Sequence, residues 1–345
     1  MTAPAATLRQ LSPQGRMLDL IVGYWVSCGV HAAARLSIAD HLAEGPKSAE
    51  ELAKAAGAHA PSLLRLLRML AGAGVFRQRA DGRWDQTPLS ETLRRDAAGS
   101  MRGFARMMVD GYSLRAWEGL LESVRTGAAA FDRVHGKRVF EYLAEHPDQA
   151  REFGEAMSSL SSVESPAIAE AIDLSGVTRL MDVGGSHGAL LAAILRRQPG
   201  VNGLVLDRPE VVESARRDAH AGDPELGGRL EFASGDFFES VPAGADACIM
   251  KYILHDWEDE LCVRLLSNCR RALPASGRLF VCENVILPGN DPSWGKLLDV
   301  NMLVGTGGRE RTEADFAQLF SAAGFRLTRV VPTAGPLSIV EGSAA

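Results

Sequence analysis

The sequence predicts an α/β fold with a mostly parallel sheet, preceded by a mainly helical segment of winged-helix type. Two observations lead to this prediction. From about Val177, short apolar runs alternate with helical patterns, which is typical of a parallel sheet covered by helices on both faces. Before that point, apolar residues recur at helical spacing, and a single Asp81-Gly82 turn joins two short strand-like runs.

The N-terminal elements follow in a simple order. Residues 1–13 read as a flexible polar tail, and apolar residues from Gln14 to about Leu42 have helical spacing. Ser48 with Glu51 has the spacing of a capping box, and a further helix opens at Pro61 and closes at Gly72. Residues 75–79 and 83–87 then form the predicted hairpin. Helices followed by a hairpin indicate a winged-helix arrangement.

A winged helix raises the alternative of DNA binding. The segment Lys47–Asp85 holds seven Lys or Arg residues against four Asp or Glu. Its candidate recognition helix, however, offers a groove only Arg65 and Arg68, and base readout needs several polar side chains on one face. A net charge of −6 also argues against a dedicated nucleic-acid binder. The pattern therefore favours a packing or dimerisation module.

The middle of the chain, residues 89–172, is helical and rich in Met, Phe and Trp. Most of these side chains are expected to pack between helices, and a minority to line a cavity for a flat apolar ligand. We therefore divide the 345 residues into a dimerisation domain (1–100), a helical connector that contributes to a pocket (101–172) and a catalytic domain (173–345).

Cysteine usage and the N-terminus bear on the compartment. The five cysteines form no C-x-x-C pair and most lie in apolar runs, so we expect reduced core thiols rather than disulfides or a zinc site. The N-terminus lacks the apolar core of a signal peptide, and no uninterrupted apolar run approaches about 18 residues. A cytoplasmic protein without a membrane span is the expectation.

The sheet is predicted from five apolar runs, and the chain ends in an antiparallel hairpin formed by residues 325–331 and 337–340. The five strand candidates are residues 180–183, 203–206, 230–233, 247–250 and 279–282. In sheets of this class the ligand lies beyond the carboxyl ends of the strands. We therefore look for the functional residues directly after each strand.

A glycine-rich turn follows the first strand. Asp182 is followed by Gly184, Gly185 and Gly188, and then by an amphipathic helix. Glycines let the backbone turn sharply close to a ligand, and the N-terminus of the helix attracts anionic groups. Dinucleotide-binding proteins use a similar loop, so the turn alone does not identify the ligand.

The next strand ends narrow the choice. Asp207, about twenty-five residues after the loop, is placed to accept hydrogen bonds from ribose hydroxyls. Asp236 beside Phe237 suits an adenine, because the carboxylate accepts from the amino group and the ring packs on the base. Each residue alone has a structural explanation, such as a helix cap or a core aromatic. One candidate at each successive strand end is a much more specific pattern.

The motifs LMDVGGSHGALL, LDRPEVV, GDFF, KYILHDWEDE, CENVILP and GGRERT together resemble those of O-methyltransferases that use S-adenosylmethionine (SAM), of the plant caffeate type and the bacterial natural-product type. The resemblance covers nearly the whole chain. It implies a Rossmann-like catalytic domain, a winged-helix dimerisation domain and a homodimer. It also implies SAM as cofactor, S-adenosylhomocysteine as product, no metal, and a glycine loop that holds the methionine part of SAM.

The resemblance also implies roles for individual residues. His255 matches the general base, and Glu283 and Glu310 match the carboxylates that flank it. The cofactor-binding positions are Ser161, Asp182, Gly184, Gly185, Asp207, Asp236, Phe237, Lys251, Asp256 and Trp257. Among these, Lys251 and Trp257 are assigned to the adenine end, and Ser161 and Asp256 to the methionine end. The positions that contact the acceptor are Phe153, Met157, Met302 and Leu303, with Tyr252 near them.

One departure from the family pattern lies in the loop, where Ser186 and His187 follow two glycines instead of a third glycine. His187 is a second candidate base. The expected acceptor is the hydroxyl of a polycyclic aromatic of polyketide, quinone or phenazine type, because the expected pocket wall is apolar and rich in Met. The alternatives are N-methylation of a heteroaromatic ring and, in another class, a winged-helix regulator that binds SAM without catalysis.

Overall fold

The computed structural model describes residues 12–217, 223–226 and 228–345. Contacts divide the chain into two compact units, residues 1–114 with 146–160 and residues 115–145 with 161–345. The predicted tail before Gln14 falls almost wholly outside the described residues. Its last residue, Pro13, is already helical, because Ser12 caps the first helix by accepting a hydrogen bond of 3.1 Å from the Gly15 N–H.

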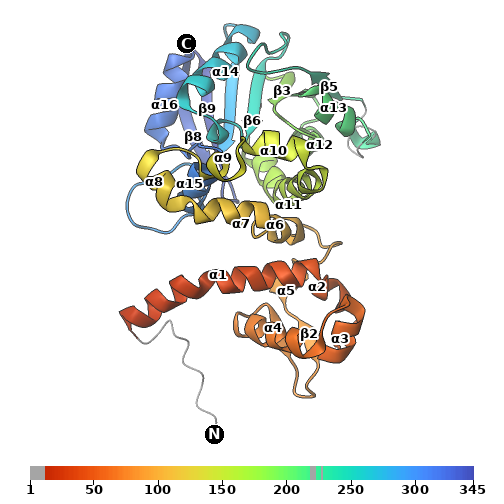
Figure 1. Ribbon diagram of the computed structural model, residues 1–345. Coiled ribbons are helices and arrows are strands. Elements are labelled where there is room, and N and C mark those ends of the chain that lie inside the picture. Colours follow the sequence, from red (N-terminus) through yellow and green to blue (C-terminus); the bar gives the residue numbers. More distant parts are fainter. Residues whose placement is uncertain (1–11, 218–222, 227) are drawn as a thin grey trace. The chain divides into compact units, whose positions relative to one another are not determined.

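The first unit is mainly helical, with one hairpin (Figure 1). Its elements are α1 (Pro13–Arg35), α2 (Ile38–His41), α3 (Ala49–Ala56), α4 (Ala60–Gly72), β1 (Phe76–Gln78), β2 (Trp84–Gln86), α5 (Pro88–Glu91) and α6 (Arg102–Met107), followed by the first half of α7 (Gly111–Glu118) and the N-terminal part of α11 (Pro147–Ala171). The capping box at Ser48 and the antiparallel hairpin are confirmed. The helix expected to run to Leu42 instead breaks after α1, where Ser37 adopts a left-handed conformation (φ 52°).

The second unit contains the sheet and its helices. Before the sheet come the last residues of α7, then α8 (Leu120–Thr126), α9 (Ala130–His135), α10 (Val139–Glu145) and the rest of α11. The sheet region comprises β3 (Arg179–Val183), α12 (Ala189–Arg197), β4 (Asn202–Asp207), α13 (Pro209–Ala215), η3 (Pro224–Leu226), β5 (Leu230–Ser234), β6 (Ala247–Lys251), η4 (Leu254–Asp256), α14 (Asp259–Ala272), β7 (Arg278–Glu283), α15 (Trp294–Gly305), α16 (Glu313–Ala322), β8 (Phe325–Pro332) and β9 (Ser338–Ala344).

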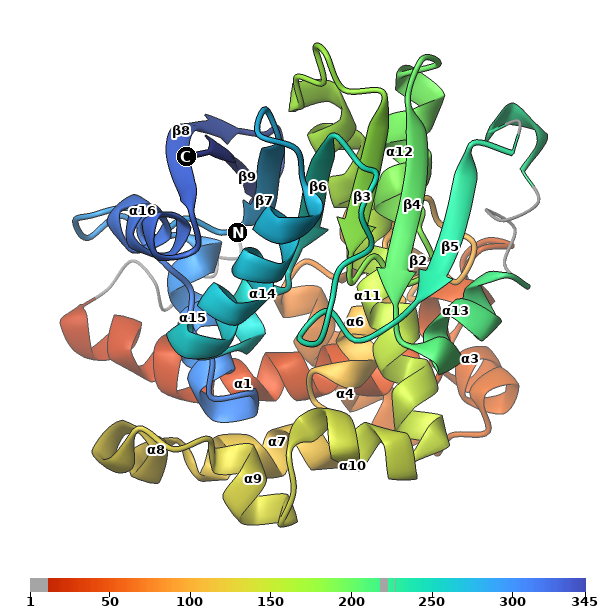
Figure 2. The same ribbon diagram turned by 90° about the horizontal axis from the view of Figure 1, so that it is seen from above.

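The strands of the second unit form one sheet in the order β5-β4-β3-β6-β7-β9-β8, and Figure 2 shows β5, β4, β3, β6 and β7 side by side. The strands β3 to β7 are parallel, whereas β9 is antiparallel to both β7 and β8. All five predicted parallel strands and the closing hairpin are confirmed. The chain leaves β3 toward β4 on one side and returns to β6 on the other, so the carboxyl ends of β3 and β6 border a topological switch point.

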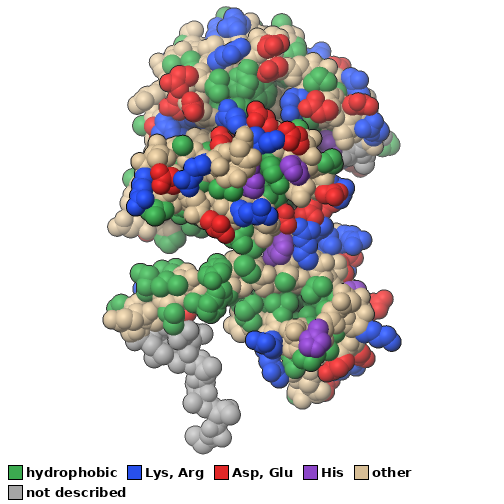
Figure 3. All heavy atoms as spheres, in the orientation of Figure 1, with side chains coloured by type: hydrophobic (Ala, Val, Ile, Leu, Met, Phe, Trp, Pro, Cys, Tyr) green, Lys and Arg blue, Asp and Glu red, His purple; other side chains and the backbone are tan. Residues whose placement is uncertain are grey.

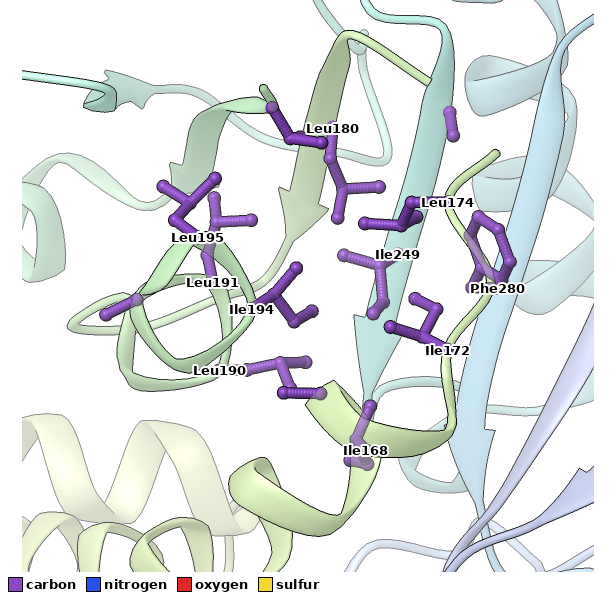
Figure 4. Close-up of a cluster of buried hydrophobic side chains, with 14 of the residues drawn as sticks. Ile168, Ile172, Leu174, Leu180, Leu190, Leu191, Ile194, Leu195, Ile249 and Phe280 are labelled. Carbon is purple, nitrogen blue, oxygen red and sulfur yellow. The ribbon is translucent and has the colours of Figure 1, made fainter. Parts of the chain in front are cut away.

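Alternate residues of each strand pack on opposite faces of the sheet. Leu180 and Ile249 belong to one cluster, which packs against α12 and the end of α11 (Figure 4), whereas Met181 and Met250 belong to the other, which packs against α14 and α16. This arrangement explains why the strands read as nearly continuous apolar runs. Buried on both faces, the strands give a rigid base to the loops at their ends.

The outer side of α1 is apolar and exposed. Hydrophobic side chains gather over this helix on the face seen in Figure 3. The exposed residues are Met17, Leu18, Leu20, Ile21, Tyr24 and Trp25. Helix α1 has the length and mean hydropathy of a membrane span, although scattered polar residues interrupt its apolar run. These two properties alone are weak evidence for a span, because other apolar helices share them.

Candidate active site

The glycine-rich turn connects β3 to α12 as a left-handed loop. Gly184 (φ 76°), Ser186 (φ 52°) and Gly188 (φ 79°) all have positive φ, a conformation that costs a side-chain-bearing residue about 1–2 kcal/mol. At Gly185 the constraint is space, because an added Cβ would lie 2.5 Å from the carboxyl carbon of Asp182. The backbone of the loop therefore lies in direct contact with the carboxylate of Asp182.

Asp182 is buried at the end of β3, and burial raises the pKa of its carboxyl to about 7. Its Oδ2 has no hydrogen-bond partner among the described residues. The nearby positive charge of Lys251 partly opposes the rise in the pKa. A buried carboxylate oxygen without a partner, beneath a glycine loop, is suited to receive a donor from a ligand.

The carboxylate of Asp207 ties the end of β4 to this loop. Its Oδ2 accepts a hydrogen bond of 2.8 Å from the Ser186 N–H, and its Oδ1 accepts one of 2.7 Å from the Arg208 N–H. Burial raises the pKa of Asp207, and the two backbone donors oppose that rise. After β5, Asp236 Oδ1 similarly accepts from the Phe238 N–H at 2.8 Å. The two carboxylates are therefore held by backbone groups at successive strand ends.

Aromatic rings connect the end of β5 to the residues after β6. The rings of Phe237 and Phe238 lie 4.7 Å apart, and Phe238 meets Trp257 edge to face at 4.8 Å. Phe140 of α10 stacks near Trp257 at 6.4 Å, and the guanidinium of Arg138 lies 5.4 Å from the Trp257 ring. The sequence-predicted residues Phe237 and Trp257 are thus joined through Phe238 in one aromatic cluster.

A polar cluster joins the end of β6 to α11. Lys251 Nζ donates to Ser161 Oγ at 2.8 Å and to Glu164 Oε2 at 3.2 Å. The Tyr252 hydroxyl donates to the other oxygen of Glu164 at 2.8 Å. The family resemblance assigns Lys251 and Ser161 to different ends of SAM, whereas their side chains are hydrogen bonded to each other in the ligand-free fold.

His255 lies in the short 3-10 turn η4, which follows β6. Its Nδ1 is 2.8 Å from Glu310 Oε1, and its Nε2 is 3.8 Å from Asp256 Oδ1. The ring of Tyr252 stacks on the imidazole with centroids 5.0 Å apart and planes inclined by 23°. The side chain of His255 is only 8% exposed and that of Glu310 is fully buried. A carboxylate on Nδ1 fixes the tautomer and leaves Nε2 as the atom that receives a proton.

The charges around His255 decide its protonation. Burial lowers the pKa of His255, but the carboxylates of Asp256, Glu310 and Glu283 outweigh that effect and raise the pKa to about 9. Burial likewise raises the pKa of Glu283 to about 7. The surrounding carboxylates therefore favour the imidazolium, which is the form that His255 would take on accepting a proton. A bound cation would lower the pKa of His255 again.

The two flanking carboxylates contact different parts of His255. Glu310 contacts the ring, whereas Glu283 Oε1 accepts from the backbone N–H groups of Ile253 (3.2 Å), Leu254 (2.6 Å) and His255 (3.1 Å). Glu283 Oε2 and Glu310 Oε2 are buried without a hydrogen-bond partner in the part of the chain that the structure describes. Glu310 is therefore placed to orient the imidazole, and Glu283 to hold the turn.

The expected acceptor residues fall in both units. Leu303 of α15 lines a cavity of about 710 Å³ together with Trp257, Asp299 and Glu310. Met302, the residue before Leu303, is buried. Asp299 Oδ1 accepts a hydrogen bond of 2.9 Å from the Glu310 N–H. Phe153 and Met157 are half-buried residues of the α11 segment that belongs to the first unit.

Two other expectations concern metals and thiols. Among the described residues, no group of three His, Cys, Asp or Glu could hold a metal ion. All five cysteines are free thiols, and four of them are buried, as expected of reduced core residues.

Sequence reasoning missed two buried charged residues in this region. Glu164 lies three residues after Ser161 and therefore on the same face of α11, a spacing that could have indicated a shared partner. Arg311 lies within the GGRERT motif, and its guanidinium is fully buried. Charged residues are almost never fully buried unless paired, so its burial could not be expected from sequence alone.

Family models match both parts of the chain. A model of an O-methyltransferase domain matches residues 117–326, and a model of an O-methyltransferase dimerisation domain matches residues 18–96. The phenazine O-methyltransferase PhzM of Lysobacter antibioticus is 44% identical over 94% of each chain. The mitomycin biosynthesis 6-O-methyltransferase of Streptomyces lavendulae is 40% identical over 94% of this chain and 92% of its own.

Solved structures show the same fold. The crystal structure of LaPhzM has a TM-score of 0.91 and 43% identity, and the match covers 97% of this chain and all of the other. The methyltransferase NcsB1 from neocarzinostatin biosynthesis, solved with SAM and 2-hydroxy-5-methyl naphthoic acid, has a TM-score of 0.77 and 34% identity. That match covers 92% of this chain and 96% of the other.

Proposed function

The chain belongs to the family of SAM-dependent O-methyltransferases with an N-terminal dimerisation domain, and we propose that it methylates a hydroxyl of a polycyclic aromatic natural-product intermediate, with His255 as the general base. One observation supports this base above all others. The imidazole lies in the interior with Nδ1 on Glu310, so that Nε2 remains to accept a proton. The imidazole also lies in the turn directly after β6, at the switch point of the sheet.

The residues around the glycine loop fit SAM. Asp182 offers a buried carboxylate oxygen that has no partner in the described part of the chain, which suits the ammonium group of the methionine part. Gly184 and Gly185 let the backbone approach, and a Cβ on either would collide with a neighbour at 2.5 Å. When bound, SAM would supply a methyl group that bonds to the acceptor oxygen as its bond to the positively charged sulfur breaks, with S-adenosylhomocysteine as the leaving group.

Each remaining contact with SAM is proposed from the family position and the local chemistry. Asp207 would accept hydrogen bonds from the ribose hydroxyls, and Asp236 with Phe237 would hold the adenine. Trp257 would lie against the adenine end through the aromatic cluster. Lys251, Ser161 and Asp256 would close the site from α11 and η4. Since Lys251 and Ser161 already share a hydrogen bond, we expect them to act on one part of the cofactor.

The proposed step at His255 is the acceptance of the hydroxyl proton at Nε2. A phenol has a pKa of about 10 and is a poor nucleophile while protonated. The Nδ1–H group of His255 stays hydrogen bonded to Glu310, whose negative charge favours the imidazolium that forms. Tyr252, stacked on the imidazole, and Glu283, bonded to the backbone of the turn, keep the ring in place while the acceptor oxygen attacks.

The acceptor class is proposed from the family positions and from the relatives. Of these positions, Leu303 lines the cavity, and Met302 and Tyr252 would add apolar and aromatic surface, which suits a flat ring system. The phenazine and naphthoic acid ring systems named for relatives are planar and polycyclic. Phe153 and Met157 stay predictions from the resemblance.

Three further expectations stay proposals. They are a homodimer formed through the N-terminal domain, a cytoplasmic location, and the division of the chain at residues 100 and 172. The exposed apolar side of α1 supports the dimer.

The test is a screen of hydroxylated polycyclic aromatics with SAM, read as a mass gain of one methylene unit. His255→Ala is expected to abolish most of the turnover while the affinity for SAM stays near that of the wild type. The control is His59→Ala, which removes an exposed histidine of the first unit. Full activity of His255→Ala at neutral pH would contradict the base. Binding of SAM without turnover on any acceptor would favour the regulator instead.

A further inference from the structure

Arg311 carries a charge in the interior beside the catalytic turn. Its guanidinium is fully buried, and Nη1 donates to the carbonyl of Leu254 at 2.7 Å. Nη2 donates to the carbonyl of Trp257 at 2.9 Å and to Asp259 Oδ1 at 2.8 Å. A buried charge is costly unless it is paired and hydrogen bonded, and these bonds meet that need. Two of its partners are the carbonyls on either side of His255 and Asp256.

Glu283 holds the same turn through the backbone N–H groups of the turn. Its carboxylate accepts the N–H groups of Ile253, Leu254 and His255, while Arg311 donates to carbonyls of the turn. Two buried side chains thus hold one 3-10 turn. The carboxylate holds its N–H groups, and the guanidinium holds its carbonyl groups. Such a turn has few hydrogen bonds of its own, so these two side chains supply much of its constraint.

The segment of Arg311 is itself fixed to the strand that carries Glu283. Arg311 forms a parallel bridge with Val285, and its carbonyl accepts from the Ile286 N–H at 2.9 Å. The residue before Arg311 is Glu310, which contacts the imidazole. One short segment therefore holds the His255 ring through Glu310 and the carbonyls of Leu254 and Trp257 on either side of it through Arg311.

We propose that Arg311 is a positioning residue, which holds the η4 turn so that the His255 ring stays aligned with Glu310 and with the acceptor oxygen. This inference rests on the proposed role of His255 as the base. A planar guanidinium suits the task because its fixed fork can reach two carbonyls and a carboxylate at once, which a lysine ammonium on a flexible stem does less well.

The chain offers a matched control two residues away. Arg309 pairs with the same carboxylate, through Asp259 Oδ2 at 2.7 Å, and with Asp315 at 3.5 Å. It is 46% exposed, and the structure gives it no bond to the backbone of η4. Loss of Arg309 therefore removes a similar charge and the same ion-pair partner without releasing the turn.

The experiment compares Arg311→Met, Arg311→Lys and Arg309→Met with an acceptor found in the screen. Misplacement of a catalytic group by about 1 Å costs on the order of 100-fold in rate, so we expect kcat of Arg311→Met to fall by about that factor. The KM for SAM and for the acceptor should change by a much smaller factor. Arg311→Lys should fall in between. Arg309→Met should keep the wild-type kcat, and because Arg309 also lines the cavity, any change in this control should be in the KM for the acceptor.

A second measurement does not depend on turnover. Histidine NMR of Arg311→Lys, which keeps the positive charge, should show the pKa of His255 lower than in the wild type, because the imidazole is no longer held against Glu310. This reading stands even if His255→Ala proves active, so it separates failure of the proposed base from failure of the positioning role. If Arg311→Met does not fold, Arg311→Lys decides. Wild-type kcat and an unchanged His255 titration in a folded variant would overturn the proposal.

Discussion

The Tyr252 hydroxyl donates a hydrogen bond of 2.8 Å to Glu164 Oε1, and this bond joins the segment after β6, which leads to His255, with the helix that carries Ser161. Tyr252 adopts a left-handed backbone conformation (φ 56°), which is uncommon for a residue with a bulky side chain. The acceptor, Glu164, is only 4% exposed and has Lys251 as its other partner. The bond therefore helps to maintain an unusual backbone conformation beside His255.

Replacing Tyr252 with Phe keeps the ring stacked on His255 but removes a donor to a buried carboxylate. A hydrogen bond to a charged group contributes about 1.5–3 kcal/mol, so we expect the free energy of unfolding to fall by about that amount. Urea denaturation measures the change. Tyr24→Phe is the control, because Tyr24 is 58% exposed on α1. Equal stabilities of the two variants would show that the Tyr252–Glu164 bond contributes nothing.

Glu310→Gln tests the charge beside the imidazole through the pH dependence of the rate. The base must be unprotonated to act, and neighbouring carboxylates raise the pKa of His255 in the free enzyme to about 9. The kcat/KM of the wild type should therefore rise with pH up to about that value. Removing the Glu310 charge lowers the pKa of His255, so the rise should move to lower pH.

The maximum rate of Glu310→Gln should nevertheless fall, because the imidazolium formed in the reaction loses its carboxylate. The carboxylates of Asp256 and Glu283, the other causes of the raised pKa, remain in this variant. Glu313→Gln is the control, since Glu313 is exposed on the first turn of α16. If the pH profile of Glu310→Gln coincided with that of the wild type, this would contradict the assignment of the rise in kcat/KM with pH to the titration of His255.

The sheet could be predicted from the sequence because its inner strands β3, β4, β6 and β7 are mostly buried. Residues such as Leu180 and Met181 pack on opposite sides, so each strand reads as an apolar run with sharp ends. The position of His255 after β6 followed from the same pattern. The break at Ser37 could not be predicted, because apolar residues with helical spacing continue on both sides of it.

The hydrogen-bond partners of the buried charged residues could not be predicted from the sequence either. The resemblance assigns both Glu283 and Glu310 to the flank of His255, yet one bonds three backbone N–H groups and the other bonds the imidazole. This difference depends on how the segment after α15 pairs with the end of β7, through Val285 and Arg311. Such a pairing joins residues far apart in the chain, and no local pattern encodes it.

Gly185→Ala tests whether the glycine loop needs space rather than backbone freedom. Gly185 does not have a positive φ, but an added Cβ would lie 2.5 Å from the Asp182 carboxyl carbon. Either the loop or Asp182 must shift, so we expect the affinity for SAM, measured by calorimetry, to fall by at least about tenfold, roughly 1.4 kcal/mol. Gly200→Ala, where an added Cβ meets nothing within 4 Å, should bind SAM as the wild type does. Wild-type affinity in Gly185→Ala would contradict a close approach of this loop to the cofactor.

The apolar side of α1 leads to a prediction about assembly. Leu20 is 76% exposed and Trp25 is 54% exposed, within the segment that matches the dimerisation model. Leaving a contiguous apolar face in water is unfavourable, and burying it against a second copy would contribute about 25 cal/mol for each Å² of apolar surface.

Light scattering should therefore show a dimer, and Leu20→Glu should shift it toward the monomer, because a charge would have to be desolvated in the interface. Leu121→Glu is the matched control, since Leu121 is 63% exposed on α8, outside the segment that matches the dimerisation model. A wild-type monomer, or a dimer that Leu20→Glu does not weaken, would show that α1 is not the dimer surface.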